Sequence, residues 1–507
     1  MRFLWLALFA LFMVIGNGRF GIIAAWLSSI FAIRFFRQSE KGWRGFLWLW
    51  LATAVTSSIA WYNVTAMRHL APFAEPLFFT LTAPIALIPF VVDRLYNHRW
   101  ADNPKLGFWL TLVFPISYTA LDFFSASDSP FGSFGAVAYS QMGFTSLMQI
   151  TAVFGLWILP FLIGWFASLV NYAWENNFAW PTVKRGFTIY TAILLLILGL
   201  SWGRLQFASP ATQTVNVGGY SLTETTFGNT LELARSGNEP AFRQAASDLN
   251  SQHLIQIRAL AQEGAEIVSL QEGAGMGYAE EIDALITGAA TIAQEENIYI
   301  VLPTVQLDPT GVEQFQNVVR IIDPSGAVAL EHFKYGGTQF EGSVTGSGEL
   351  QAIETPLGTL SAIICWDADF SETMQQAGKQ EIDLLFVPSN DWFELRDIHA
   401  GMATFRAVEN GVPIFRQTGS GVSTVIDAYG RVVSRVNSFD ESGTGLWSSE
   451  QIVATPIGSV NTLYPQIGDI FGQMMLIGLV GLLGFAWLKR KRAEGAMVSE
   501  PAPTPVH

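Results

Sequence analysis

The chain has 507 residues, of which 50% are hydrophobic and only 14% are charged, and it contains 38 Phe and 17 Trp. This composition excludes an ordinary water-soluble protein and is typical of a chain that lies largely in a membrane. The formal net charge of -14 argues against a nucleic-acid partner, because an acidic surface repels the phosphate backbone.

The apolar residues gather in long runs with few charges at both ends of the chain. A helix needs about 20 mostly apolar residues to cross a bilayer, and by this measure we predict eight transmembrane helices. They are expected at 3–17, 20–37, 45–64, 72–93, 106–124, 146–173, 187–204 and 470–488. The resulting plan has a membrane domain at 1–204, a large polar domain at 205–466, a C-terminal transmembrane helix with its basic flank at 467–492, and a disordered tail at 493–507.

Lysine and arginine set the expected orientation of these helices. They follow every second predicted span, at Arg34, Arg37, Lys41 and Arg44, at Arg94, Arg99 and Lys105, at Lys184 and Arg185, and at Lys489–Arg492. The segment 125–145, after an odd-numbered span, has neither residue type. Because basic loops stay in the cytoplasm, both termini are expected there, and the domain at 205–466 is expected on the outer side.

The polar domain alternates strand-like and helix-like segments. Strands are predicted at Thr214–Leu222, Glu266–Leu270, Ile298–Leu307, Asn317–Ile322, Ala327–Phe333, Leu360–Cys365, Leu384–Pro388, Pro413–Thr418 and Ser423–Ile426. Helices are predicted at Glu239–Gln262, Ala279–Glu296 and Asp397–Asn410, where apolar residues recur at helical spacing. This alternation predicts a layered α/β domain with a mixed sheet.

Cys365 is the only cysteine in the chain. It ends an apolar strand-like run and precedes a helix-like segment, so it is expected at a strand-to-helix elbow, where a nucleophile can be presented. The alternative is a buried core residue, since free cysteine is often buried. An unpaired thiol on the oxidising side of a membrane is better explained by chemistry. We therefore favour a nucleophile.

Two further residues stand just past apolar strands. Glu272 follows the strand ending at Leu270, and Lys334 follows the strand ending at Phe333. A thiol needs a base to take its proton, and a developing oxyanion needs a cation or N–H donor, so these three residues form a workable acyl-transfer set. Taken singly, a Glu after a strand is more often a solvated turn residue, and a Lys such as Lys334 is more often a surface charge.

Together these residues carry a resemblance. Their order along the chain is similar to the Glu-Lys-Cys triad of the nitrilase superfamily, and Cys365-Trp366-Asp367 is similar to the signature around that superfamily's nucleophile. With the predicted spans, the chain resembles the bacterial apolipoprotein N-acyltransferase family, and Ser389–Asp427 carries the most specific matches. The resemblance implies that the domain at 205–466 is a catalytic αββα sandwich.

The resemblance also implies a reaction at the outer face of the bacterial inner membrane. An acyl chain would pass from a phospholipid to the N-terminal amine of a diacylglyceryl-cysteine lipoprotein, through a thioester on Cys365. Glu272 is expected to act as general base and then acid, and Lys334 to hold the oxyanion together with a backbone N–H near Trp366. Residues expected to bind substrate or support the site are Glu341, Trp366, Asp367, Asn390 and Trp392.

Several expectations complete this prediction. No metal or other cofactor is expected, and the protein is expected to be a monomer. Cys365 should be partly ionised beside Lys334. His399 is expected to be a packing residue on an apolar helix face.

The segment before the base departs from the family. Leu270-Gln271-Glu272 stands where the family usually has Trp-Pro-Glu, and Asp367 stands where it has Glu. The acceptor therefore stays open. The alternatives are an acyltransferase with a different acceptor, a membrane-tethered nitrilase-type amidohydrolase that uses water in the second step, and a non-catalytic membrane protein that keeps the fold.

Overall fold

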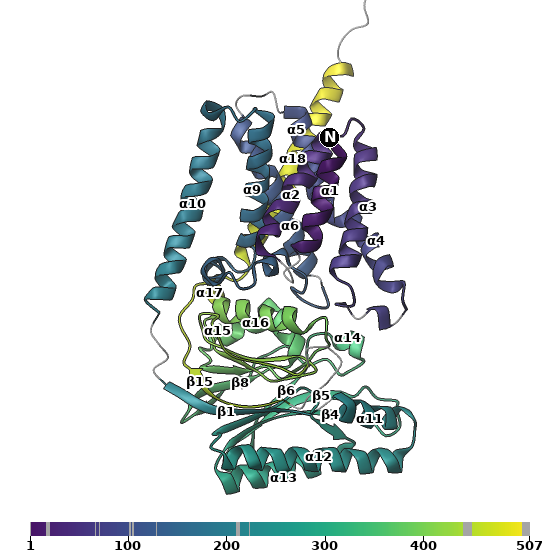
Figure 1. The fold of residues 1–507 in the computed structure, drawn as a ribbon, viewed down its shortest axis with the longest axis vertical. Coiled ribbons are helices and arrows are strands. Elements are labelled where there is room, and N and C mark those ends of the chain that lie inside the picture. The colour runs from purple at the N-terminus through teal and green to yellow at the C-terminus, as the bar shows by residue number, and fades with distance from the viewer. Residues whose placement is uncertain are drawn as a thin grey trace, which may run out of the picture.

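The computed structural model describes residues 2–16, 21–65, 67–69, 71–100, 103, 106–127, 129–208, 213–222, 224–439 and 449–498. A bundle of helices forms one end of the molecule, and a layered domain of strands and helices forms the other (Figure 1). The chain enters the layered domain after α10 (Trp180–Gln206) and returns from it to α18 (Ile470–Val498), which lies back in the bundle. The predicted disordered tail at 493–507 is wrong in its first part, because α18 continues through 493–498, and its last residues, 499–507, lie outside the described residues.

The bundle is built from the N-terminal helices together with α18. Its described helices are α1 (Arg2–Ile15), α2 (Ile22–Arg37), α3 (Gly42–Ala60), α4 (Ala74–Ala86), α5 (Ile88–Trp100), α6 (Val113–Ser127), α7 (Thr145–Met148), α8 (Thr151–Phe154), α9 (Ile158–Glu175), α10 and α18, with short 3-10 turns at Met67–His69, Gly107–Leu112 and Val137–Gln141. Apolar side chains such as Leu195, Leu196 and Leu200 of α10 stay exposed on the outside of the bundle. Such a surface suits a lipid environment.

Several of these helices could cross a membrane. Within the described residues, four segments are long and apolar enough: Ala74–Trp100, Gly107–Ser127, Trp180–Gln206 and Ile470–Lys489. A fifth follows if Thr145–Phe154 and Ile158–Glu175, which meet at a bend of 115°, form one broken span. These segments overlap five of the predicted spans. The predicted spans at 3–17, 20–37 and 45–64 coincide with helices that are shorter or less apolar than these segments. These three spans therefore stay predictions.

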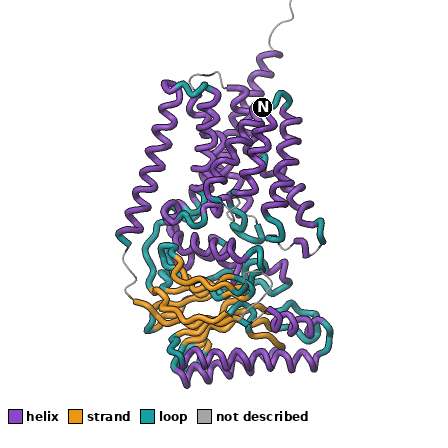
Figure 2. Tube along the Cα trace, viewed as in Figure 1, coloured by secondary structure: helices purple, strands orange, loops and turns teal. Residues whose placement is uncertain are grey.

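Two main sheets form the centre of the layered domain within the described residues (Figure 2). The first has the order β15-β1-β2-β4-β5-β6, and β3 pairs with β4. Its strands are β1 (Gln213–Ser221), β2 (Ile267–Leu270), β3 (Gly275–Gly277), β4 (Tyr299–Gln306), β5 (Gln316–Ile322), β6 (Val328–Phe333) and β15 (Ser449–Ile457). Parallel pairs join β1 to β2 and β2 to β4, whereas β15 and β5 run antiparallel to their neighbours. The sheet is therefore mixed, as the sequence predicted.

The second sheet has the order β14-β13-β11-β9-β8-β7. Its strands are β7 (Ile353–Thr355), β8 (Gly358–Ala362), β9 (Leu384–Phe386), β11 (Ile414–Arg416), β13 (Val422–Ile426) and β14 (Val432–Asn437), and a separate parallel pair joins β10 (Ser389–Asn390) to β12 (Thr418–Gly419). The two sheets pack face to face through apolar side chains that include Val217 and Val301 of the first and Leu360 and Phe415 of the second. Burying each such side chain contributes about 1.5–3 kcal/mol.

Helices cover both outer faces of this sandwich. The long helices α12 (Glu239–Gln262) and α13 (Ala279–Glu296) pack on the first sheet at the end remote from the bundle (Figure 1). On the other side, α15 (Ser371–Lys379) and α16 (Arg396–Asn410) pack on the second sheet and separate it from the bundle. The short helices α11 (Glu224–Arg235), α14 (Thr338–Glu341) and α17 (Tyr464–Ile467) lie in connections. The domain thus has the αββα layering that the resemblance implied.

The inner helix layer docks the sandwich on the bundle. Ile398 and Met402 of α16 share one apolar core with Leu159 and Trp157 of the bundle. Buried Arg406 of α16 adds a hydrogen bond to the hydroxyl of Tyr139 at 3.0 Å. The second sheet is therefore the sheet nearer the bundle, with α15 and α16 between the two.

Candidate active site

Cys365 stands at a sharp turn between β8 and α15. It opens a 3-10 turn, Cys365–Asp369, and its φ of 50° lies in the left-handed region that few residues other than glycine adopt. Such a backbone costs about 1–3 kcal/mol and is typical of functional sites. The N–H of Cys365 donates to the carbonyl of Pro388 at 2.9 Å, and the side chain is buried. The predicted elbow is therefore present.

The predicted base and lysine come from the facing sheet. Glu272 follows β2, and its N–H donates to the carbonyl of Ser389 at 3.3 Å. Lys334 follows β6, and its N–H donates to the carbonyl of Asn317 at 2.9 Å. Because Pro388 and Ser389 are neighbours, one short segment that runs from β9 into β10 holds the backbones of both Cys365 and Glu272.

Lys334 joins two glutamates in a buried ion cluster. Its Nζ donates to Glu272 Oε1 at 2.6 Å and also to Glu341 at the end of α14. The side-chain amide of Asn317 donates to the same oxygen of Glu272 at 2.9 Å. The structure therefore brings Glu272, Lys334 and Glu341 together. We call these three residues the pocket cluster.

Burial and charge shift the proton affinities in this cluster. Burial alone would lower the pKa of Lys334, but the charges of Glu272 and Glu341 outweigh it, and the pKa rises above its ordinary value. Burial raises the pKa of Glu341 to about 7, although the charge of Lys334 opposes this shift. Lys334 is therefore fully charged at neutral pH, whereas Glu341 is close to its titration midpoint.

The thiol itself is held in its neutral form. Burial raises the pKa of Cys365 well above its usual value, and the charge of Glu272 raises it further, while Lys334 lowers it by less. The expectation that Cys365 is partly ionised beside Lys334 is therefore wrong for this state of the protein. A thiol in this environment needs a base to take its proton as it attacks, and Glu272 is the carboxylate whose charge acts on it most strongly.

Asp367 ties the elbow to the segment that follows Lys334. Its carboxylate accepts the N–H groups of Tyr335 at 2.9 Å, Gly336 at 2.7 Å and Ile364 at 2.9 Å. It also bonds His332, at 2.8 Å. These bonds fix Lys334 relative to Cys365, so Asp367 positions the site through the backbone.

Trp366 packs against the same segment. A side-chain carbon added at Gly337, whose φ is 75°, would stand 2.0 Å from the Trp366 ring, so only glycine fits there. Lys334 Nζ lies 5.7 Å from the centroid of this ring. The Trp366 ring thus packs against the segment that begins at Lys334.

The remaining predicted site residues lie on either side of the nucleophile. The backbone carbonyl of Asn390 is 4.0 Å from Cys365 Sγ, and Asn390 lines a pocket of about 870 Å³ together with Glu272 and Glu341. Trp392 instead donates its indole N–H to the carbonyl of Asn63 at 2.8 Å, which joins the site to the bundle after α3.

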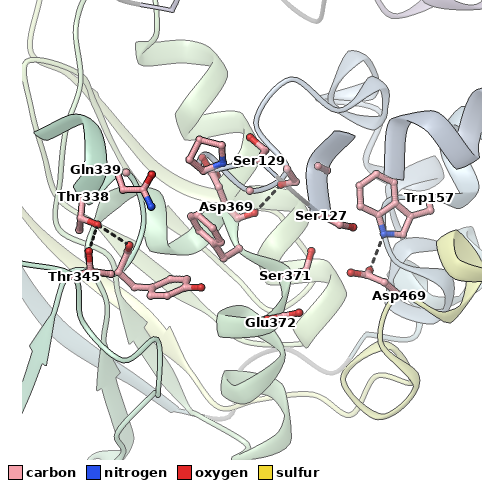
Figure 3. A pocket seen from close by; sticks show the side chains of 17 residues that line it. Ser127, Ser129, Trp157, Thr338, Gln339, Thr345, Asp369, Ser371, Glu372 and Asp469 are labelled. Carbon is pink, nitrogen blue, oxygen red and sulfur yellow. Dashed lines mark hydrogen bonds between the residues drawn. The ribbon is translucent and has the colours of Figure 1, made fainter. Parts of the chain in front are cut away.

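A second cavity, of about 420 Å³, lies where the sandwich meets the bundle (Figure 3). Its polar lining includes Ser127, Thr338, Asp369 and Asp469, and Trp157 donates its indole N–H to Asp469 at 2.7 Å. Its lining includes neither Glu272 nor Cys365. Since Thr338 begins α14 and Glu341 ends it, this short helix separates the two cavities.

Another buried ion cluster was missed by sequence reasoning. Both oxygens of Asp391 accept hydrogen bonds from Arg416, at 3.0 and 2.9 Å, and His399 Nδ1 lies 2.7 Å from Asp391 Oδ1. We call Asp391, His399 and Arg416 the sealed cluster, because all three side chains are buried. Burial would raise the pKa of Asp391, but the charges of Arg416 and His399 lower it. His399 is therefore an ion-cluster residue as well as a packing residue.

Three ligand types also meet beside the thiol. Cys365, Asp391 and His399 each offer one ligand atom, and these three atoms lie within 4.8 Å of one another. This spacing is short enough for a metal ion. However, Arg416 already places a cation on both oxygens of Asp391 and 3.0 Å from His399 Nδ1. The donor set is thus engaged by a guanidinium, and it fits a structural ion cluster better than a metal centre.

The comparisons with known proteins agree with this fold and site. Residues 218–449 match the family model of the carbon-nitrogen hydrolases, a family of the nitrilase superfamily. The chain as a whole is similar to proteins named apolipoprotein N-acyltransferase. One from Pasteurella multocida (strain Pm70) is 24% identical over 96% of this chain and 97% of its own length. Another, from Geobacter metallireducens, is 21% identical over 81% of this chain and 80% of its own length.

An amidase from Nesterenkonia sp. AN1 aligns with 52% of this chain and 97% of its own, at 20% identity and a TM-score of 0.37. The resemblance to the nitrilase superfamily and to apolipoprotein N-acyltransferases, predicted from the sequence, is confirmed by the family model and the curated relatives.

Proposed function

We propose that this protein is a membrane N-acyltransferase. It transfers an acyl chain from a phospholipid to the N-terminal amine of lipoproteins that begin with diacylglyceryl-cysteine. The observation that carries this proposal is the pocket cluster beside a strained, buried Cys365. Similarity to enzymes of this name over nearly the whole chain, bundle included, supports the acceptor and a membrane reaction.

The first half-reaction forms a thioester. Glu272 takes the thiol proton as Cys365 Sγ attacks the ester carbonyl of the phospholipid. The charge of Lys334 and the backbone N–H of Trp366 stabilise the oxyanion. When the ester C–O bond breaks, protonated Glu272 gives its proton to the leaving oxygen. Lysophospholipid departs, and the acyl group stays on Cys365.

The second half-reaction forms the amide. The neutral amine of the acceptor attacks the thioester carbonyl, and Glu272 takes a proton from the nitrogen. The C–S bond then breaks, and Glu272 returns the proton to the sulfur of Cys365. Because each half-reaction returns Glu272 to its ionised form, the cycle closes with no redox step and no further reactant.

The bundle gives this chemistry access to lipid. We propose that the protein is a monomer in the bacterial inner membrane. Its termini lie in the cytoplasm and its sandwich lies outside, because basic residues follow every second predicted span. A reporter enzyme that works only outside the cytoplasm is expected to be active when it is fused after Arg204. A reporter that works only inside the cytoplasm is expected to be inactive at the same position. Cytoplasmic activity of that fusion would contradict the orientation.

The decisive experiment offers the purified protein phospholipid without an amine. A hydroxylamine-sensitive acyl-enzyme and lysophospholipid are expected in equal amounts, because the thioester then lacks its nucleophile. Adding a diacylated lipopeptide with a free N-terminal amine should convert the thioester into an amide. Steady release of free fatty acid without an acyl-enzyme would instead identify a membrane-tethered hydrolase.

A further inference from the structure

The pocket of about 870 Å³ extends well beyond the pocket cluster. Glu272, Glu341 and Asn390 line one part of it, and residues of α11 and of the connection after β4 line another. In Figure 1, α14, which ends at Glu341, lies close to the bundle, whereas α11 lies farther from it. The pocket therefore leads from the proposed reaction centre away from the membrane.

The outer part of this pocket combines an apolar wall with an acidic mouth. Phe227 and Leu231 of α11 face it together with Leu307 after β4. The acidic lining residues of the mouth are Glu239, Asp308 and Glu313, and among the described lining residues Arg235 is the only basic one. Glu239 is already paired with Arg243 at 2.9 Å, so the negative charge of the mouth rests on Asp308 and Glu313.

The negative charge of Asp308 is fixed by the fold. Its carboxylate accepts the N–H groups of Glu313 at 2.9 Å, Val312 at 2.9 Å and Thr310 at 3.2 Å. These hydrogen bonds lower the pKa of Asp308 to about 2, and the bond from the Glu313 N–H has the largest effect. The connection 308–313 is thus closed around a permanent anion, and Glu313 is exposed beside it.

The acceptor of the proposed reaction has two dissimilar ends. Its diacylglyceryl group stays in the bilayer, and its polypeptide has to leave the reaction centre on the aqueous side. A donor acyl chain is a poor occupant of the outer pocket, since it would leave the bilayer and remove water from the acidic groups at the mouth. A polypeptide can place apolar side chains against the apolar wall and polar groups at the acidic mouth.

We propose that this pocket holds the first residues of the acceptor polypeptide after its cysteine, and that its acidic mouth favours acceptors with basic residues there. The inference rests on the proposed function and adds a specificity to it. Glu313 and Asp308 attract the peptide through charge, so the preference has to weaken with salt.

Two diacylated lipopeptides test this inference. They are identical except that the third and fourth residues are both lysine in one and both glutamate in the other. The measured quantity is the rate of discharge of the preformed acyl-enzyme by each peptide. The lysine peptide is expected to react about fivefold faster at low ionic strength, in the range of exposed charge pairs, and the ratio should fall towards one in high salt.

A charge reversal at the mouth and a matched control locate the effect. Glu313→Lys is expected to abolish or invert the ratio between the two peptides. Glu354→Lys makes the same change on the exposed face of β7, which belongs to the other sheet, and should keep the wild-type ratio. Because each ratio is taken within one variant, a general loss of activity does not affect it.

The outcomes separate the inference from the proposed function. An acyl-enzyme that never forms refutes the proposed function. An acyl-enzyme that forms and is discharged equally by both peptides in low salt refutes the inference alone. A third result, in which Leu231→Ala changes the chain-length preference for the phospholipid donor but not the peptide ratio, assigns the pocket to an acyl chain and also overturns the inference.

Discussion

Two buried ion clusters flank Cys365, and they differ in their access to solvent. In the pocket cluster, 27% of the Glu341 side chain is exposed, and both glutamates line the large pocket. In the sealed cluster, Asp391 is fully buried and Arg416 is 1% exposed. Similar residue types therefore meet the thiol from two sides, but only one side is open to a substrate.

The clusters also differ in how their charges balance. Arg416 pairs with both oxygens of one aspartate, which keeps the opposite charges close and offsets part of their desolvation. Lys334 instead pairs with two glutamates, and burial raises the pKa of Glu341 to about 7. A group that titrates near neutrality in a pocket is suited to chemistry, whereas a matched pair is suited to holding loops in place. We therefore propose that the pocket cluster serves the reaction and that the sealed cluster serves the architecture.

The largest effect is expected from Cys365→Ser. A serine hydroxyl is far less ionised than a thiol beside the same base, so this variant should form no acyl-enzyme on incubation with phospholipid. Intact-protein mass spectrometry measures the acyl group directly. Retention of a covalent acyl group by the variant would place the nucleophile elsewhere.

Glu272→Gln tests the reactive side of the comparison. Loss of a general base typically slows a reaction by about 10²-fold to 10⁴-fold, and we expect this reduction in the rate of lysophospholipid release. Glu349→Gln, on an exposed loop outside the pocket lining, is the matched control and should retain wild-type rates. A reduction of less than about tenfold for Glu272→Gln would remove it from the role of base.

Arg416→Met tests the sealed side. Removing one partner of a buried pair costs about 3–5 kcal/mol, so the variant should unfold at a clearly lower temperature in detergent. Lys334→Met should lose activity but less stability, because Glu341 faces the pocket and can take up a proton. Equal loss of stability in the two variants would erase the distinction between the clusters.

Much of the fold could be read from local sequence pattern. The helices at Glu239–Gln262 and Ala279–Glu296 match the prediction, because their apolar residues recur at helical spacing. The strand β15 was missed, since it contains Pro456 and owes its place to pairing with β1 from the far end of the domain. Helix α11 was missed as well, because Gly228 and its threonines weaken the helical pattern.

The candidate site, like the fold, could be predicted only in part from the sequence. Glu272, Lys334 and Cys365 could be proposed from the sequence because each follows an apolar strand, the first two after β2 and β6 of the first sheet and Cys365 after β8 of the second. The contact between Asp391 and His399 could not, since it depends on how a loop and α16 fold together. The neutral state of the thiol also lay beyond the sequence, because it follows from burial.

The smallest expected effect concerns the pH dependence that Glu341 gives to the pocket cluster. Since its pKa is raised to about 7, Glu341 is mostly neutral below pH 6 and mostly charged above pH 8. Glutamine resembles the neutral acid in shape and charge, so Glu341→Gln should acylate at nearly the wild-type rate in acid. Above the midpoint the wild type gains a charge next to Lys334 that the variant lacks.

The ratio of the two acylation rates should therefore change by a few fold, and the change should be centred near pH 7. Titrations shared by both proteins, such as that of Cys365, cancel in this ratio, which makes it specific for position 341. Stopped-time measurements of lysophospholipid release between pH 5 and pH 9 would record it. A ratio that stays constant across this range would show that Glu341 does not titrate in the pocket, and the contrast between a titrating cluster and a sealed one would then rest on solvent access alone.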